Sequence, residues 1–122
     1  DGIILSSLTM LLTGFLLGFG EVVFRQMLAF ALICFIWHWL ARLFKSFPLN
    51  LALPLQIMAA AGLSLLYGLI LDVSSALIFS TPILAYILAG LTFDLLHAAS
   101  TALFYPIIFS IFRRFSHEKT TD

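Results

Sequence analysis

Charged residues are scarce in this chain of 122 residues: Asp, Glu, Lys and Arg make up 10% of it, against about 25% in average soluble domains. Hydrophobic residues make up 62%, and the mean hydropathy is +1.14. So little polar sequence cannot coat a water-soluble core of this size. The formal net charge is zero, so no electrostatic argument favours a nucleic-acid partner.

The chain also lacks the usual signs of catalysis or metal binding. Its single cysteine, Cys34, lies in an apolar run, which excludes an internal disulfide and favours a buried free thiol. It has no nucleophile elbow, phosphate-binding loop or metalloprotease helix motif. The sequence therefore predicts no cofactor, no metal centre and no enzyme activity.

What remains is long apolar sequence, divided by a few charges into five uncharged stretches: 2–20, 26–41, 46–71, 73–93 and 95–112. About 20 apolar residues in a helix cross the hydrocarbon of a bilayer, where the backbone must hydrogen-bond to itself. The sequence therefore predicts an all-α integral membrane protein, with one transmembrane domain over 1–115 and a polar tail over 116–122. Because the chain begins with Asp1, we expect it to be incomplete at its N-terminus.

The stretch 73–93 is the difficult one. Basic residues follow both the second and the last stretch, and the positive-inside rule places both clusters in the cytoplasm: Arg42, Lys45, Arg113, Arg114 and Lys119. The number of crossings between them must then be even. We therefore expect about four spans, with 73–93 not crossing. It is predicted to break near 74–81, where Ser80-Thr81-Pro82 resembles a helix start, and to form a short interfacial or re-entrant helix over about 82–93.

Two pairs near the first turn are candidate partner contacts. Gly14 and Gly18 are four residues apart on one helix face, a spacing that allows close helix approach, although internal packing is the commoner reason for it. Glu21 and Arg25 are also four apart and would form an exposed ion pair on a helix.

Three further candidates are polar residues with apolar flanks. Asp72 and Asp94 would be costly at the centre of a membrane. The predicted topology places both at the outer interface, where a boundary or capping role is favoured over a functional one. His97 lies three residues after Asp94, and a structural hydrogen bond between them is preferred over a proton relay or half of a metal site.

Three segments resemble the MreD family, small multi-pass subunits of the bacterial rod-shape machinery. Residues 100–109, followed by Arg113-Arg114-Phe115, are similar to that family's closing helix, with an aromatic–proline step and a basic exit. Residues 25–53 are similar to a span with a basic exit and a short turn. Residues 14–21 resemble its glycine-spaced helix, although the family usually ends that helix with Asp, where this chain has Glu21.

The resemblance implies a non-catalytic scaffold in the bacterial inner (cytoplasmic) membrane. Family members contact the bitopic protein MreC and, through it, a RodA-like glycosyltransferase with its penicillin-binding transpeptidase and, indirectly, MreB filaments. Membrane lipids would be the other partner.

The family's fold is similar to that of the substrate-binding subunits of energy-coupling-factor vitamin transporters, which supplies an alternative function. A carrier needs a cavity with a few placed polar groups, and this sequence offers Gln56, Tyr67, Asp72, Tyr86, Asp94 and His97. A third class, an intramembrane enzyme, would need two of Asp72, Asp94 and His97 within hydrogen-bond reach.

Overall fold

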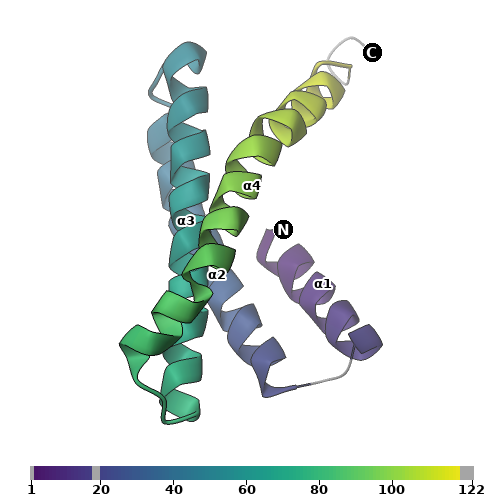
Figure 1. The fold of residues 1–122 in the computed structure, drawn as a ribbon. Helices are drawn as coiled ribbons and strands as arrows, with labels where there is room; N and C mark the ends of the chain where they lie inside the picture. Colours follow the sequence, from purple (N-terminus) through teal and green to yellow (C-terminus); the bar gives the residue numbers. More distant parts are fainter. Residues whose placement is uncertain (1, 18–19, 119–122) are drawn as a thin grey trace.

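The chain folds into four helices, seen in a computed structural model that describes residues 2–17 and 20–118. They are α1 (Gly2–Leu17), α2 (Glu21–Phe44), α3 (Leu49–Ile78) and α4 (Ile83–Glu118) (Figure 1). The all-helical prediction is confirmed for these residues. The last helix continues three residues into the predicted tail, of which residues 119–122 lie outside the described part.

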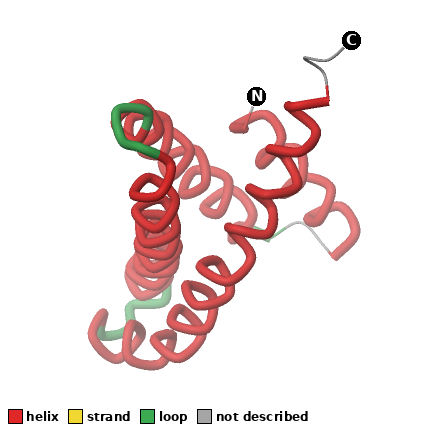
Figure 2. Tube along the Cα trace, turned by 90° about the horizontal axis from the view of Figure 1, so that it is seen from above, coloured by secondary structure: helices red, strands yellow, loops and turns green. Residues whose placement is uncertain are grey.

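Helix α3 is the centre of the arrangement. It packs against both α2 and α4, while α1 packs only against α2 (Figures 1 and 2). The backbones of α2 and α4 make no contact with each other within the described residues. The three long helices therefore form an open trough, with α3 as its base and α2 and α4 as its walls.

The turn between α2 and α3 lies where the sequence predicts it. Helix α2 ends at Phe44, and the Phe47 N–H donates to the Phe44 carbonyl at 3.2 Å. Pro48 then precedes α3, and its carbonyl accepts the first helical bond, from Leu51 at 2.9 Å. Helix α3 begins at Leu49, so Pro54 lies beyond its first turn.

The prediction of a separate element over 73–93 is wrong. Helix α3 continues to Ile78, a tight turn occupies 79–82, and α4 begins at Ile83. Ser80 has φ 51°, and the Thr81 N–H donates to the Ala76 carbonyl at 3.0 Å, which is the Schellman closure of a helix C-terminus. Only the predicted helix start after Thr81 is confirmed.

No short interfacial or re-entrant helix follows the turn, because nothing between Gly90 and Pro106 ends a helix. Asp94 is flanked by apolar helix-formers, and α4 runs on through it and through Pro106. Two long apolar helices, α3 and α4, lie between the two basic clusters, which is an even number. The α2–α3 turn and the C-terminal part of α4 accordingly lie at the same end of the molecule (Figure 1).

Three of the helices, α2, α3 and α4, are long and apolar enough to cross a membrane. Helix α1 has 16 residues, which is shorter than the roughly 20 that a span needs. Few apolar side chains are buried between the helices, and they are mostly small: Ala29, Phe44, Ala52, Leu63, Ala76 and Ala98. The large apolar residues mostly face outward, as expected for a membrane protein.

The arrangement makes a prediction about topology. In a variant with Cys34 replaced by Ala, Ser80→Cys and Lys45→Cys lie at opposite ends of α3, so an impermeant maleimide should label them from opposite sides of the membrane. Arg113→Cys serves as the control and should label from the same side as Lys45→Cys. Labelling of Ser80→Cys and Lys45→Cys from one side would contradict the assignment of α3 as a crossing.

Candidate functional site

The contact between α3 and α4 is built from a motif that occurs once on each helix, Gly-x-x-x-Asp. Helix α3 carries Gly68 and Asp72, and α4 carries Gly90 and Asp94. The helices are antiparallel, so each aspartate faces the glycine of the other helix: a Cβ added at Gly68 would overlap the Asp94 carboxyl, and one added at Gly90 would overlap the Asp72 carboxyl. We call these four residues the Asp–Gly seam.

The seam holds two carboxyl groups close together in an apolar setting. Each aspartate is the fourth residue after its glycine, so Asp72 and Asp94 lie about one turn, roughly 6 Å, apart along the contact. Asp94 is only 8% exposed. The Oδ2 atom of Asp72 is buried and has no hydrogen-bond partner among the described residues.

The capping role predicted for the two aspartates is wrong, because neither lies at the end of a helix. Asp94 lies about three turns, roughly 16 Å, into α4, and Asp72 lies roughly 9 Å before the end of α3. Both therefore sit within helices and face a neighbouring helix. The capping role was expected because residues 73–93 were predicted to form a separate element, with Asp72 and Asp94 at its two edges.

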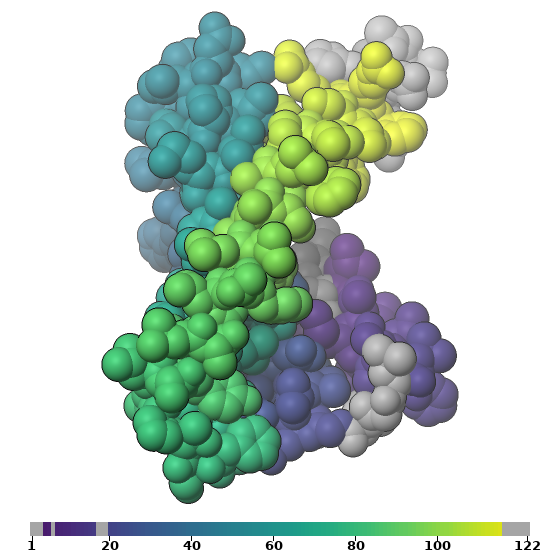
Figure 3. All heavy atoms as spheres, viewed as in Figure 1, coloured from purple at the N-terminus to yellow at the C-terminus, as the bar shows by residue number. Residues whose placement is uncertain are grey.

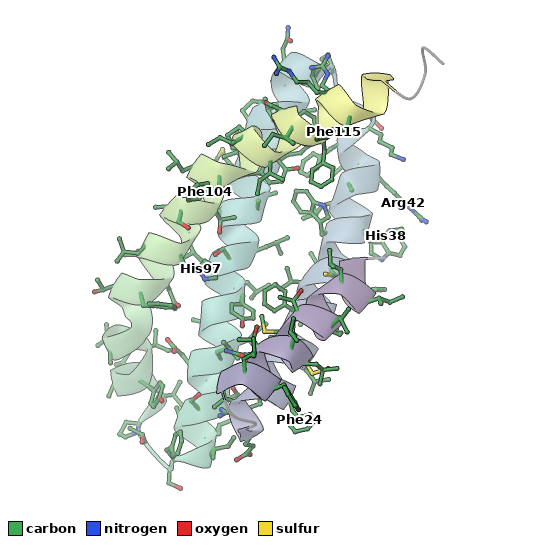
Figure 4. All side chains as sticks on the ribbon, turned by 90° about the vertical axis from the view of Figure 1, so that its right-hand side faces the viewer. Phe24, His38, Arg42, His97, Phe104 and Phe115 are labelled. Carbon is green, nitrogen blue, oxygen red and sulfur yellow. The ribbon has the colours of Figure 1, made fainter. Side chains whose placement is uncertain are left out.

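His97 does not make the predicted hydrogen bond with Asp94. Its ring lies edge-on to Tyr67, with centroids 6.0 Å apart, and contacts Phe93 at 6.3 Å. Figure 4 shows His97 pointing from α4 toward α3. Among the described side chains, no hydrogen bond joins any two of Asp72, Asp94 and His97.

Arg25 joins α2 to α3. Its guanidinium donates to the Ser75 hydroxyl at 3.0 Å and to the Ser74 hydroxyl at 3.4 Å, while its buried Nε has no partner within the described chain. Glu21, the exposed first residue of α2, makes no ion pair with it in the described structure. The guanidinium thus serves an interhelical contact in place of the predicted Glu21–Arg25 pair.

Of the two glycines Gly14 and Gly18, only Gly14 lies in the described part of the chain. Gly14 is buried on α1, the helix that packs against α2. Gly18 lies outside the described residues. The position of Gly14 is compatible with the internal packing that the sequence favoured for this pair.

The trough between the three long helices contains a cavity of about 710 Å³. Half of its lining residues carry an aromatic ring, and no lining residue is Asp, Glu, Lys or Arg. The lining residues are Phe30, Ile33, Cys34, Phe35, Trp37, His38 and Ala41 from α2, Ala60, Leu63, Ser64 and Tyr67 from α3, and His97, Thr101 and Tyr105 from α4.

Polar groups from α3 and α4 interrupt this aromatic wall. The Thr101 hydroxyl lies 2.9 Å from the His97 carbonyl and 3.3 Å from the Ser64 hydroxyl. Tyr105 donates to the Gln56 side-chain carbonyl at 3.1 Å. The Tyr67 hydroxyl and the His97 ring nitrogens make no hydrogen bond within the described structure, so they remain available to a ligand.

The two tryptophans occupy different environments, although they are only two residues apart in the sequence. Trp37 lines the cavity and contacts Tyr105 across the trough, with centroids 5.7 Å apart. Trp39 is 60% exposed, and the Arg42 guanidinium lies over its ring at 5.8 Å. Arg42 points away from the bundle (Figure 4).

Gly68, Gly90 and the cavity were not predicted from the sequence. The repeated Gly-x-x-x-Asp spacing was a signal that could have linked each aspartate to a glycine. The cavity had no such signal, because its residues come from three helices at unrelated spacings. Of the residues proposed for a carrier, the structure places Tyr67 and His97 on the cavity wall.

The described chain is all-helical, and three of its helices are long and apolar enough to span a membrane, which is consistent with an α-helical membrane protein. Comparisons with known protein families, with curated proteins and with solved structures find no match to this chain.

The seam predicts that Gly68→Ala destabilises the protein by about 1–3 kcal/mol, because the added methyl group overlaps the Asp94 carboxyl. The control on the same helix is Gly62→Ala, since nothing lies within 4 Å of a Cβ added there. Unfolding in detergent micelles measures both. Adding Asp94→Ala to Gly68→Ala should recover stability. The seam geometry would be contradicted if Gly68→Ala caused no loss of stability and Asp94→Ala restored none.

The Arg25 contact predicts unequal effects for two adjacent serines. Ser75→Ala removes the shorter bond to the guanidinium and should cost about 1.5 kcal/mol. Ser74→Ala should cost less, because its hydroxyl lies 3.4 Å from Arg25 and donates to the Leu71 carbonyl. The same detergent unfolding assay measures the order, and a larger loss for Ser74→Ala would contradict this assignment.

Proposed function

We propose that this chain is a non-catalytic subunit of a membrane complex, acting by helix–helix contact, and that the complex is the cell-wall elongation machinery. Its partners would be an MreC-like bitopic protein and a RodA-like glycosyltransferase with its transpeptidase, with MreB reached indirectly. It would reside in the bacterial inner membrane as a multi-pass protein. The resemblance of three segments to the MreD family supplies these partner identities.

The observation that supports a contact role is the isolation of the C-terminal half of α4. Helix α4 packs only against α3, and its C-terminal half stands clear of α1 (Figures 1 and 3). Large apolar side chains are exposed along it: Leu103, Phe104, Ile107, Ile108 and Ile111. The same segment carries the resemblance to the closing helix of the family.

The orientation of this surface follows from charge. The positive-inside rule places Arg42, Lys45, Arg113 and Arg114 in the cytoplasm. The C-terminal half of α4 would then lie in the cytoplasmic leaflet, and the turn at 79–82 would face outward. A partner helix could reach the surface from within the bilayer without displacing any helix of this chain.

Two matched pairs of substitutions test the proposal. Leu103→Ala with Ile107→Ala removes apolar volume from the proposed contact, where the side chains are 65% and 51% exposed. The control, Leu84→Ala with Leu88→Ala, removes two leucines that are 70% and 61% exposed at the other end of α4. Both keep the helix apolar, so insertion should be unaffected.

Co-purification with MreC-like and RodA-like proteins should fall about tenfold for the first pair, which corresponds to about 1.4 kcal/mol, and should be unchanged for the control. If both variants recovered equal amounts of the partner proteins, the proposed contact would not lie on this half of α4. A stable wild-type monomer that recovers neither partner would overturn the proposed function.

The alternative is the substrate-binding subunit of a vitamin transporter of the energy-coupling-factor type. The cavity favours it, because its volume of about 710 Å³ lies in the range of small-molecule sites, about 300–1,000 Å³. Thermal stabilisation of the purified chain by a vitamin is its test. A rise in the melting temperature with one vitamin and not with others would rank this function above the scaffold.

A further inference from the structure

The cavity between α2, α3 and α4 has the chemistry of a ligand site of a particular kind. None of its lining side chains is an acid, a lysine or an arginine. His38 and His97 are the only lining side chains that can become positively charged, and no carboxylate lines the wall. A charged ligand would therefore lose its hydration and gain at most an imidazolium as counter-ion, which is unfavourable in an apolar site. The wall instead offers aromatic faces, which suit a flat apolar body.

The polar groups of the cavity define the second requirement. The Tyr67 hydroxyl and the His97 ring nitrogens have no hydrogen-bond partner within the described chain, and the ring centroids lie 6.0 Å apart. The Ser64 hydroxyl oxygen lies 3.3 Å from the Thr101 hydroxyl, and no described group accepts the Ser64 proton. Two helices thus present unused donors to the same space, an arrangement that a ligand oxygen would satisfy.

The route into the cavity is the third constraint. The backbones of α2 and α4 do not touch, so the trough is open along the side opposite α3. Phe35, which lines the cavity, is an exposed apolar side chain on the α2 wall of the trough. In a bilayer this side faces hydrocarbon, so a ligand would enter by first dissolving in the membrane.

We propose that this cavity binds a neutral, membrane-soluble molecule with a flat apolar body and a carbonyl or hydroxyl oxygen. The body lies among Phe30, Trp37 and Tyr105, and the oxygen accepts a hydrogen bond from Tyr67 or Ser64. The site belongs to the isolated chain and does not depend on the proposed partner contact. It also narrows the carrier alternative, because the wall offers an anionic vitamin neither Lys nor Arg.

The two tryptophans provide the experiment. The full chain is purified in detergent micelles and titrated with menadione, a neutral flat quinone that quenches tryptophan fluorescence. Trp39→Phe leaves only Trp37, on the cavity wall, and its fluorescence should be quenched saturably. Trp37→Phe leaves only Trp39, which is 60% exposed, and should show linear quenching from partition into the micelle.

Further variants are made in the Trp39→Phe protein. Ala60→Phe fills the cavity and should abolish saturation, while Ala99→Phe, on the exposed side of α4, should leave it unchanged. Tyr67→Phe with Ser64→Ala removes two donors and should weaken binding at least tenfold. Each variant is compared by its melting temperature, so that loss of binding is scored only in folded protein.

The chemistry of the ligand is tested with a sulfonated naphthoquinone, which keeps the flat ring and adds a negative charge. It should give no saturable quenching of Trp37. Linear quenching of Trp37 by menadione, as expected if only lipid or detergent tails enter the trough, would overturn the site. Binding of the sulfonated probe as tight as that of menadione would overturn the proposal that the ligand is neutral. Failure of co-purification with partner proteins bears only on the scaffold function.

Discussion

The close approach of α3 and α4 at the Asp–Gly seam is the contact on which the rest of the arrangement depends. Each aspartate occupies space that the missing side chain of the opposite glycine leaves free. Two such contacts about one turn apart fix both the register and the antiparallel direction of the pair. A membrane gives little hydrophobic drive for helices to associate, so small residues that permit close packing determine where they meet.

With that pair fixed, α3 becomes the base on which the other walls are placed. Arg25 attaches α2 to α3 near the turn at 79–82, on the side of the molecule where the seam also lies. Toward the other end the helices are joined by aromatic contacts, such as Trp37 with Tyr105. The structure is therefore tight at one end and open along the trough, which is why a cavity lined by rings and uncommitted polar groups exists there.

The successes and errors of the sequence-based expectations have identifiable causes. The turn after Phe44 was predictable because Pro48 and the neighbouring charges act locally. The error over 73–93 came from treating Asp72 and Asp94 as the edges of an element, although a lone acid does not end an apolar helix. The left-handed residue that ends a helix in a Schellman turn is usually Gly, but here it is Ser80. The sequence therefore has no glycine to indicate the boundary between α3 and α4.

The sequence alone determined that the chain is helical and suited to a bilayer, because apolar length and scarce charge act residue by residue without reference to any neighbour. Only the tertiary structure decided what the polar residues do. Asp94 faces Gly68, Arg25 faces Ser75, and His97 faces Tyr67. Each of these pairs joins residues on different helices, and their meeting depends on the register of the packed helices, which composition and spacing within a single segment do not specify.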